Sequence, residues 1–356
     1  MRIAVDAMGG DHAPHRPVAG ALAALAEGGR DFEIVLVGDE SQLAPLLPRE
    51  SPFEYLSVLH APEVIGMEES PAAALRRKRR SSIAEGIALQ KRGLADAFVS
   101  AGNTGAVMAA ALTSLGRIQG LARPAIVVVF PTQAEPCAVL DAGANAECKP
   151  HHLAQFALMG HVYAVEILGR ATPRIGLLSI GEEAGKGNDL TVAAHALLAE
   201  SGLDFVGNVE GRDVLRGAVD VVVTDGFTGN VLLKFGESFA DFLASEVRRE
   251  VSADPRAALG AWLMKPAFQR LQRRIDYAEY GGAPLLGVDG TVIICHGGSS
   301  VKAFRNAILL TRRAVRRDLA NRIEHAIAGF GKRETPPPDP AKPVAASVVA
   351  AERGER

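Results

Sequence analysis

The stretch Val99-Ser100-Ala101-Gly102-Asn103-Thr104-Gly105-Ala106-Val107 decides the fold. An apolar run, 97–99, ends in small and polar residues, and a helix-compatible run, 106–115, follows. This order predicts a strand, a tight loop and a helix, which is the repeating unit of an α/β protein. The glycines let the backbone turn sharply, and free N–H groups at the start of a helix favour an anion.

The same pattern returns as Thr224-Asp225-Gly226-Phe227-Thr228-Gly229-Asn230-Val231, again after an apolar strand. A third predicted strand, 291–295, runs into His296-Gly297-Gly298-Ser299-Ser300 and another helix. Three such loops predict one anion site at the carboxyl ends of the strands, although each alone is also compatible with an ordinary turn. The candidate phosphate and substrate ligands are Ser100, Gly102, Asn103, Thr104, Gly105, Asn145, Gly229, Asn230, Ser299 and Ser300.

The remaining sequence predicts further strand–helix units. Strands at 3–5, 32–38 and 54–60 are each followed by a loop or helix, which favours a mostly parallel sheet between helices, a three-layer α/β/α fold. Asp289-Gly290 predicts a tight hairpin turn and one antiparallel strand. We expect one domain over residues 1–330 with a projecting helical hairpin at about 235–280, and a disordered Pro/Ala-rich tail at 331–356.

Composition narrows the function classes. The formal net charge of −2 argues against nucleic-acid binding, and 48% apolar residues suffice for a full core. Three widely spaced cysteines, Cys137, Cys148 and Cys295, favour neither a disulfide framework nor a zinc site and fit a reducing cytosol. We identify no signal peptide, and no apolar run approaches the roughly 20 residues that span a bilayer.

Two segments suggest surfaces for partners. The run Arg76-Arg77-Lys78-Arg79-Arg80 predicts either a solvated helix end or a docking patch for an acidic partner or phosphate. The segment 259–275 is basic and amphipathic, carries Trp262, Leu263 and Met264, and is predicted to break at Pro266. Contact with a membrane surface, contact with a second subunit and packing in the core all fit this segment.

The sequence resembles the bacterial phosphate acyltransferases of phospholipid synthesis over nearly all of residues 1–330. The blocks that carry the resemblance are Val5-Asp6-Ala7-Met8-Gly9-Gly10-Asp11, Ser100 to Ala106, Leu140-Asp141-Ala142-Gly143-Ala144-Asn145, Gly207 to Asp213, Asp225 to Val231, Gly281 to Gly287 and Ile294-Cys295-His296-Gly297. One departure is Gly298, which stands between Gly297 and the two serines where the family pattern is His-Gly-Ser-Ser.

The resemblance implies a fold similar to phosphate acetyltransferases and isocitrate-dehydrogenase-like proteins, a homodimer, and neither a metal nor a nucleotide cofactor. The implied reaction transfers an acyl group from acyl-acyl-carrier protein to inorganic phosphate, which gives acyl phosphate and free carrier. The product would feed a glycerol-phosphate acyltransferase in the membrane. We therefore expect a cytoplasmic enzyme that is peripherally associated with the inner face of the membrane. The residues expected to dock the acidic carrier are Arg76, Arg77 and Lys78. Those expected to contact the membrane are Trp262, Leu263 and Met264.

This chemistry needs positioning and charge stabilisation more than covalent catalysis, because phosphate supplies its own nucleophilic oxygen. Lys186 or His296 can supply charge or a proton, and Asp225 can orient a donor. Cys295 is compatible with an acyl-carrying nucleophile or a buried thiol. Two other classes of function stay open. One is a cofactor-dependent dehydrogenase on a related fold, although the sequence lacks the Gly-x-Gly-x-x-Gly motif of dinucleotide-binding proteins. The other is a non-enzymatic membrane adaptor that docks the carrier.

Overall fold

The structure is a computed structural model that describes residues 1–29, 31–47 and 55–330, so the tail predicted at 331–356 lies outside the described residues. A seven-stranded sheet has the order β3-β2-β1-β4-β12-β11-β5. Strands β1, β2, β3, β4 and β12 are parallel, and β11 is antiparallel to both of its neighbours. The bounds are β1 (Arg2–Asp6), β2 (Glu33–Gly38), β3 (Leu56–His60), β4 (Ala97–Ser100), β5 (Ala125–Ile126), β11 (Ala283–Leu286) and β12 (Thr291–Ile294).

A five-stranded sheet follows the order β6-β7-β10-β8-β9, with only β6 antiparallel to its neighbour. Its bounds are β6 (Val128–Phe130), β7 (Cys137–Leu140), β8 (Ile175–Leu178), β9 (Phe205–Val209) and β10 (Val221–Val223). The predicted α/β class and the antiparallel hairpin are confirmed, but the strands form two sheets where one was expected. The division falls at Val127, because β5 pairs with β11 on one side of it and β6 pairs with β7 on the other.

Helices cover both faces of the seven-stranded sheet. Ile3 and Val5 pack under α1 (His15–Gly28) and α11 (Val301–Arg316), whereas Ala4 faces α4 (Ser82–Lys91) and α5 (Thr104–Ser114). Successive residues of a strand point to opposite faces, so a strand that is apolar throughout needs helices on both sides. This explains why β1 is a continuous apolar run rather than an alternating one.

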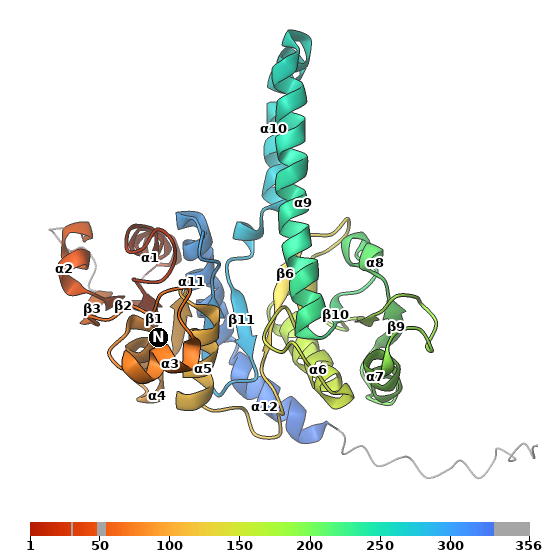
Figure 1. Ribbon diagram of the computed structural model, residues 1–356, viewed down its shortest axis with the longest axis horizontal. Helices are drawn as coiled ribbons and strands as arrows, with labels where there is room; N and C mark the ends of the chain where they lie inside the picture. The colour runs from red at the N-terminus through yellow and green to blue at the C-terminus, as the bar shows by residue number, and fades with distance from the viewer. Residues whose placement is uncertain (30, 48–54, 331–356) are drawn as a thin grey trace, which may run out of the picture.

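The five-stranded sheet is covered in the same way. Apolar residues of α6 (Pro150–Glu166), α7 (Asp189–Ala199) and α12 (Leu319–Gly329) share one buried cluster with β7, β8 and β10. On the opposite face, α8 (Gly211–Arg216) packs against β7 and β10. Figure 1 shows the two sheets with their helices as the two halves of the molecule. The short elements are α2 (Glu40–Leu43), η1 (Ala44–Leu46), α3 (Pro71–Arg77) and η2 (Tyr277–Glu279).

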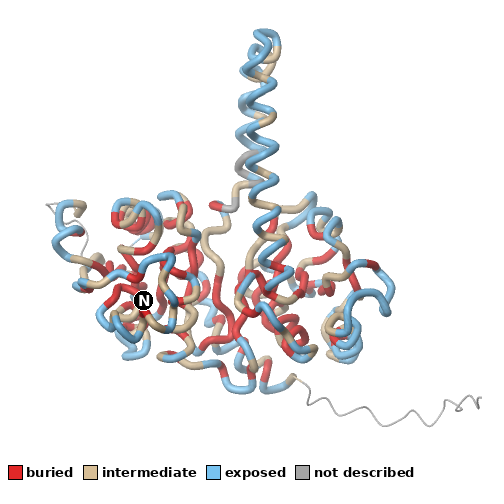
Figure 2. The backbone as a smooth tube through the Cα atoms, in the orientation of Figure 1, coloured by how far each residue is buried: buried red, intermediate tan, exposed pale blue. Residues whose placement is uncertain are grey.

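A helical hairpin projects from the body between the two halves (Figure 1). It consists of α9 (Gly226–Ala253) and α10 (Pro255–Ile275), and most of its length is exposed (Figure 2). Helix α9 has 28 residues, so it is about 42 Å long at 1.5 Å per residue. The predicted break at Pro266 is wrong, because α10 runs through it. Proline removes one backbone hydrogen bond, and the remaining ones together with the packing of α10 along α9 keep the helix continuous.

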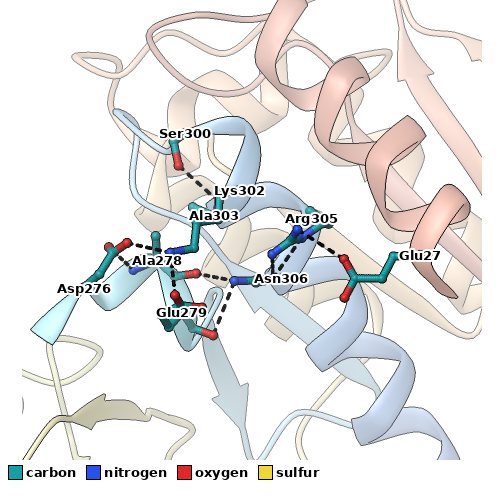
Figure 3. Close-up of polar contacts among 9 residues, drawn as sticks. All are labelled: Glu27, Asp276, Ala278, Glu279, Ser300, Lys302, Ala303, Arg305 and Asn306. Carbon is teal, nitrogen blue, oxygen red and sulfur yellow. Dashed lines mark hydrogen bonds and ion pairs between the residues drawn. The ribbon is translucent and has the colours of Figure 1, made fainter. Parts of the chain in front are cut away.

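The base of the hairpin is fixed to α11 by polar contacts (Figure 3). Lys302 Nζ donates to Asp276 at 2.9 Å and to Glu279 at 2.6 Å. Asn306 Nδ2 donates to the carbonyl of Ala278 at 2.7 Å. The hairpin therefore joins the body at a defined place rather than through a free linker.

Candidate functional site

The loops after β4 and β12 lie side by side at one edge of the seven-stranded sheet. Ile294 is level with Ser100, and the N–H of Cys295 donates to the Ser100 carbonyl at 2.8 Å. Parallel pairing therefore brings the two sets of predicted residues together. They are Ser100, Gly102, Asn103, Thr104 and Gly105 after β4, and His296, Ser299 and Ser300 after β12.

The loop after β1 joins this group through Asp6, which the sequence reasoning did not assign to the site. The buried Asp6 carboxylate accepts hydrogen bonds from Ser100 Oγ at 2.6 Å and from the N–H of Met8 at 3.0 Å. Ser100 Oγ in turn accepts from the N–H of Gly102 at 3.0 Å. Burial raises the pKa of Asp6, and the hydrogen bond from Ser100 acts against this. An acid as the last residue of the strand, after the apolar run 3–5, is the signal that could have identified it.

Asn103 shapes the start of α5 and has little capacity left for a ligand. Its Oδ1 accepts from the N–H of Ala106 at 3.0 Å, which caps the helix. Its Nδ2 donates to three carbonyl groups of the segment 66–69. Thr104 and Gly105 follow in the first turn, and Thr104 is exposed. The first-turn N–H groups have no intrahelical partner, so this end of α5 suits an anion.

The β12 loop places His296 at the surface. The N–H of Gly298 donates to His296 Nδ1 at 3.1 Å, so the neutral ring carries its proton at Nε2. Ser300 caps α11, and Ser299 is buried. Arg16, which the sequence reasoning missed, donates to the carbonyls of Gly298 at 3.0 Å and Ser299 at 3.3 Å and so ties this loop to α1.

The loops after β7 and β10 form a second group, at the five-stranded sheet. The N–H of Gly226 donates to the carbonyl of Asn145 at 2.8 Å. A Cβ at Gly229 would overlap the carbonyl oxygen of Asp141, so close packing of the two loops requires glycine there. Asn145 is buried, whereas Asn230 is exposed. Strand pairing thus brings Asn145, Gly229 and Asn230 together.

Asp225 and Lys186 belong to this second sheet but differ in setting. Asp225 caps α9, accepting from the N–H of Thr228 at 2.9 Å and from its hydroxyl at 2.8 Å. Both carboxylate oxygens are therefore committed to orienting Thr228. Lys186 lies exposed in the loop after β8, where its carbonyl accepts from Ser179 Oγ at 2.9 Å. This loop contributes a cation near the strand ends of the second sheet.

The predicted anion ligands thus fall into two groups on two sheets. One buried cluster connects them: it contains Val107 and Ala111 of α5 together with Ala142, and Leu233 of α9 packs against it. The side of α5 and the first turns of α9 therefore flank the junction of the sheets. A single phosphate site shared by Thr104 and Asn230 stays a prediction.

Comparison with known proteins agrees with this architecture. Residues 1–322 match the family model described as fatty acid synthesis protein. A phosphate acyltransferase of Pelotomaculum thermopropionicum is 53% identical over 327 residues, which cover 92% of this chain and 95% of that protein. A phosphate acyltransferase of Heliobacterium modesticaldum is 50% identical over 92% of this chain and 98% of that protein. The chain belongs to the phosphate acyltransferase family. It is an acyltransferase.

Solved structures of low sequence identity share the fold. A phosphotransacetylase from Streptococcus pyogenes superposes with a TM-score of 0.60 at 18% identity, over 88% of this chain and 94% of that one. A branched-chain phosphotransacylase from Enterococcus faecalis V583 gives 0.56 at 14% identity, over 88% and 99% of the two chains. These likenesses confirm the phosphate-acetyltransferase-like fold.

The basic run of this acyltransferase lies close to the first group of loops. Glu69, whose carbonyl accepts from Asn103, pairs with Arg77 at 3.1 Å and Lys78 at 2.5 Å. Lys78 also lowers the pKa of Glu69 by its hydrogen bond. Lys78 is thus half-buried and committed, whereas Arg76 is exposed and, among the described residues, forms no ion pair. Arg79 and Arg80 are likewise exposed and form no ion pair among the described residues.

The hairpin carries exposed apolar side chains on both helices. Trp262 is 69% exposed on α10, and Leu263 and Met264 are exposed beside it. On α9, exposed apolar residues recur every three or four positions, which places them on one face: Phe227, Val231, Phe235, Phe239 and Phe242. None of the helices in the described part of the chain is long and apolar enough to cross a bilayer.

The cysteines are poor nucleophiles. Cys295 is buried at the end of β12, and burial raises its pKa to about 12. Burial likewise raises the pKa of Cys137 to about 12 and of Cys148 to about 11. A thiol must ionise to attack a thioester, so the buried-thiol interpretation of Cys295 is the better one. Within residues 1–29, 31–47 and 55–330, no group of three acidic, histidine or cysteine side chains is placed to hold a metal ion.

Proposed function

We propose that this acyltransferase moves a fatty acyl group from acyl-acyl-carrier protein to inorganic phosphate, forming acyl phosphate for phosphatidic acid and phospholipid synthesis. A phosphate oxygen attacks the thioester carbonyl, the carbon–oxygen bond forms, the carbon–sulfur bond breaks and the carrier leaves as a thiolate that takes up a proton. The observation that carries the proposal, beside family membership, is the exposed first turn of α5 at Thr104, where the N–H groups of Thr104 and Gly105 have no intrahelical partner and suit phosphate.

Within this proposal, each site residue has its own role. Thr104 and Gly105 on α5, with Gly229 and Asn230 on α9, bind phosphate. Asp225 holds Thr228 in place, and Lys186 neutralises the charge of phosphate. His296 donates from Nε2 to the charge that develops on the carbonyl oxygen or sulfur. The remaining predicted residues hold the loops that carry these groups, through the hydrogen bonds described above. They are Ser100, Gly102, Asn103, Asn145, Ser299 and Ser300.

The carrier docks at the basic run. An acidic partner is attracted by Arg76, Arg79 and Arg80, whose charges are not neutralised by any described ion pair. Arg77 and Lys78 contribute by holding Glu69, and with it the segment 66–69 that contacts Asn103. This position delivers the thioester next to the first group of loops.

The enzyme works as a homodimer in the cytoplasm, attached to the inner face of the membrane. The apolar face of α9 packs against a second copy, and Trp262, Leu263 and Met264 of α10 contact the lipid. Attachment is reversible, because two or three buried side chains contribute only about 1.5–3 kcal/mol each. There the acyl phosphate passes to a glycerol-phosphate acyltransferase of the membrane.

Incubation of the purified protein with acyl-acyl-carrier protein and ¹⁸O-labelled phosphate tests the reaction. We expect mass spectrometry to detect acyl phosphate that carries the label, together with free carrier. Release of free fatty acid alone would show a thioesterase. Carrier binding without phosphate-dependent thioester loss would show a docking adaptor and would refute the proposal.

A further inference from the structure

Asp141, at the end of β7, has no assigned role in the chemistry above, yet it is a centre of hydrogen bonding. Its side chain is 0% exposed. Five N–H groups donate to its carboxylate at 2.7–3.2 Å, and within the described residues it has no ion-pair partner. The donors are the backbone N–H groups of Ile126, Gly143, Ala144 and Asn145 and the side-chain amide of Asn145. A buried carboxylate needs such a complete set of donors.

These hydrogen bonds connect the two sheets. Ile126 belongs to β5 of the seven-stranded sheet, whereas Asp141 follows β7 of the five-stranded sheet. The N–H of Ala142 donates back to the Ile126 carbonyl at 2.9 Å, and Asn145 Nδ2 donates to the carbonyl of Pro124 at 2.7 Å. The loop of one sheet is thus bound to a strand of the other through Asp141 and the residues it orders.

The same loop presses against the start of α9. The N–H of Asp141 donates to the Thr224 carbonyl at 3.0 Å, and Gly226 donates to Asn145. A Cβ at Gly226 would lie 2.6 Å from Asp141 Oδ2, so the first turn of α9 rests directly on this carboxylate. The position of Asn230 relative to β5 therefore depends on Asp141.

We propose that Asp141 is a positioning residue that fixes the two groups of site loops, one on each sheet, relative to each other. Its effect on catalysis rests on the proposed function, in which groups on α5 and α9 act on the same phosphate. Misplacing one group by about 1 Å costs on the order of 100-fold in rate even when each group still binds. Asparagine at 141 keeps the size of the side chain but turns an NH₂ group toward N–H donors.

The test compares Asp141→Asn with a matched control, Asp220→Asn. Asp220 lies before β10, at the opposite end of the same sheet, and accepts from the N–H of Arg174 at 2.9 Å. We expect Asp141→Asn to lower kcat on the order of 100-fold while the KM for phosphate stays within about threefold. Asp220→Asn should leave both constants unchanged at a temperature where both variants are folded.

A second measurement does not depend on activity. Spin labels at the exposed residues Thr113 of α5 and Ala196 of α7, in a Cys148→Ser background, report the distance between the two halves. We expect the distance distribution to be broader in Asp141→Asn than in the wild-type protein. In Asp220→Asn we expect it to be unchanged. If Asp141→Asn does not fold, Asn145→Ala removes only the side-chain amide contacts and should show the same changes at smaller size.

The outcomes separate the two proposals. An unchanged distance distribution in Asp141→Asn, or equal broadening in Asp220→Asn, would overturn the positioning role. So would a rise in the KM for phosphate at constant kcat, because that pattern means lost phosphate binding. If the wild-type protein forms no acyl phosphate, the proposed function fails, and the distance measurement still decides the role of Asp141.

Discussion

At the scale of single residues, the reactivity of Cys295 tests whether the reaction passes through an acyl-enzyme. With a pKa of about 12, only about one Cys295 thiol in ten thousand is ionised at pH 8, so we expect slow alkylation of the folded protein and acceleration only as the pH approaches 12. Cys295→Ala should retain kcat. Rapid inactivation by iodoacetamide at pH 8, or a burst of free carrier without phosphate, would instead indicate covalent catalysis.

Thr104 and Asn230 test at the same scale whether α5 and α9 share one phosphate. Loss of a donor to a charged group costs about 1.5–3 kcal/mol, so Thr104→Val should weaken phosphate kinetics roughly tenfold to over a hundredfold. The measurement is the KM and kcat for phosphate in Thr104→Val, Asn230→Ala and the double variant. Normal phosphate kinetics in a folded double variant would show that the anion binds elsewhere.

At the scale of elements, the basic run 76–80, which begins in the last turn of α3, is expected to hold the carrier. Arg76→Glu/Arg79→Glu should raise the KM for acyl-carrier protein more than the KM for phosphate, because exposed charges steer an acidic partner. The effect should shrink as salt rises, since charges are screened within about 10 Å at 0.1 M. Lys91→Glu/Arg92→Glu, an exposed pair at the far end of α4, is the matched control. Equal carrier binding in a low-salt titration by both variants would exclude this surface.

Helix α10 is expected to contact lipid through its exposed apolar residues. Trp262→Glu/Leu263→Glu should abolish sedimentation with anionic vesicles while the dimer and the activity in solution persist. The burial of two apolar side chains is lost, and two like charges are brought to an anionic surface. A fall to monomers in this variant would assign the segment to a subunit contact, and wild-type protein that never sediments would end the membrane proposal.

At the scale of the whole molecule, we expect the exposed apolar face of α9 to form the contact of the proposed dimer. Phe235 and Phe239 stack with ring centroids 5.9 Å apart, and both are more than half exposed. If a second copy covers them, Phe235→Asp/Phe239→Asp should convert the dimer to a monomer in light scattering, because two charges would be buried without partners. A control at Arg248, which is exposed on α9, should leave the dimer intact when changed to alanine. A dimer that survives the aspartates would place the interface elsewhere.

The local sequence determined the elements and several of their ends. Continuous apolar runs such as Ile3 to Val5 predicted strands buried on both faces, and Asp289-Gly290 predicted the turn between β11 and β12. Asp254 capped α10 as its residue type suggests. These features follow from interactions between residues a few positions apart, which a sequence displays directly.

Only the tertiary structure decided which loops meet. Three features depend on contacts between distant residues. They are the division into two sheets at Val127, the continuation of α10 through Pro266, and the hydrogen bonds from the Asn103 amide to the segment 66–69. The hydrogen bond from the Ile126 N–H to the Asp141 carboxylate, which joins the two sheets, is another such contact. Strand order and side-chain partners are settled by the packing of the whole chain, because a polar side chain such as Asn103 can satisfy a cap, a neighbouring loop or a ligand equally well.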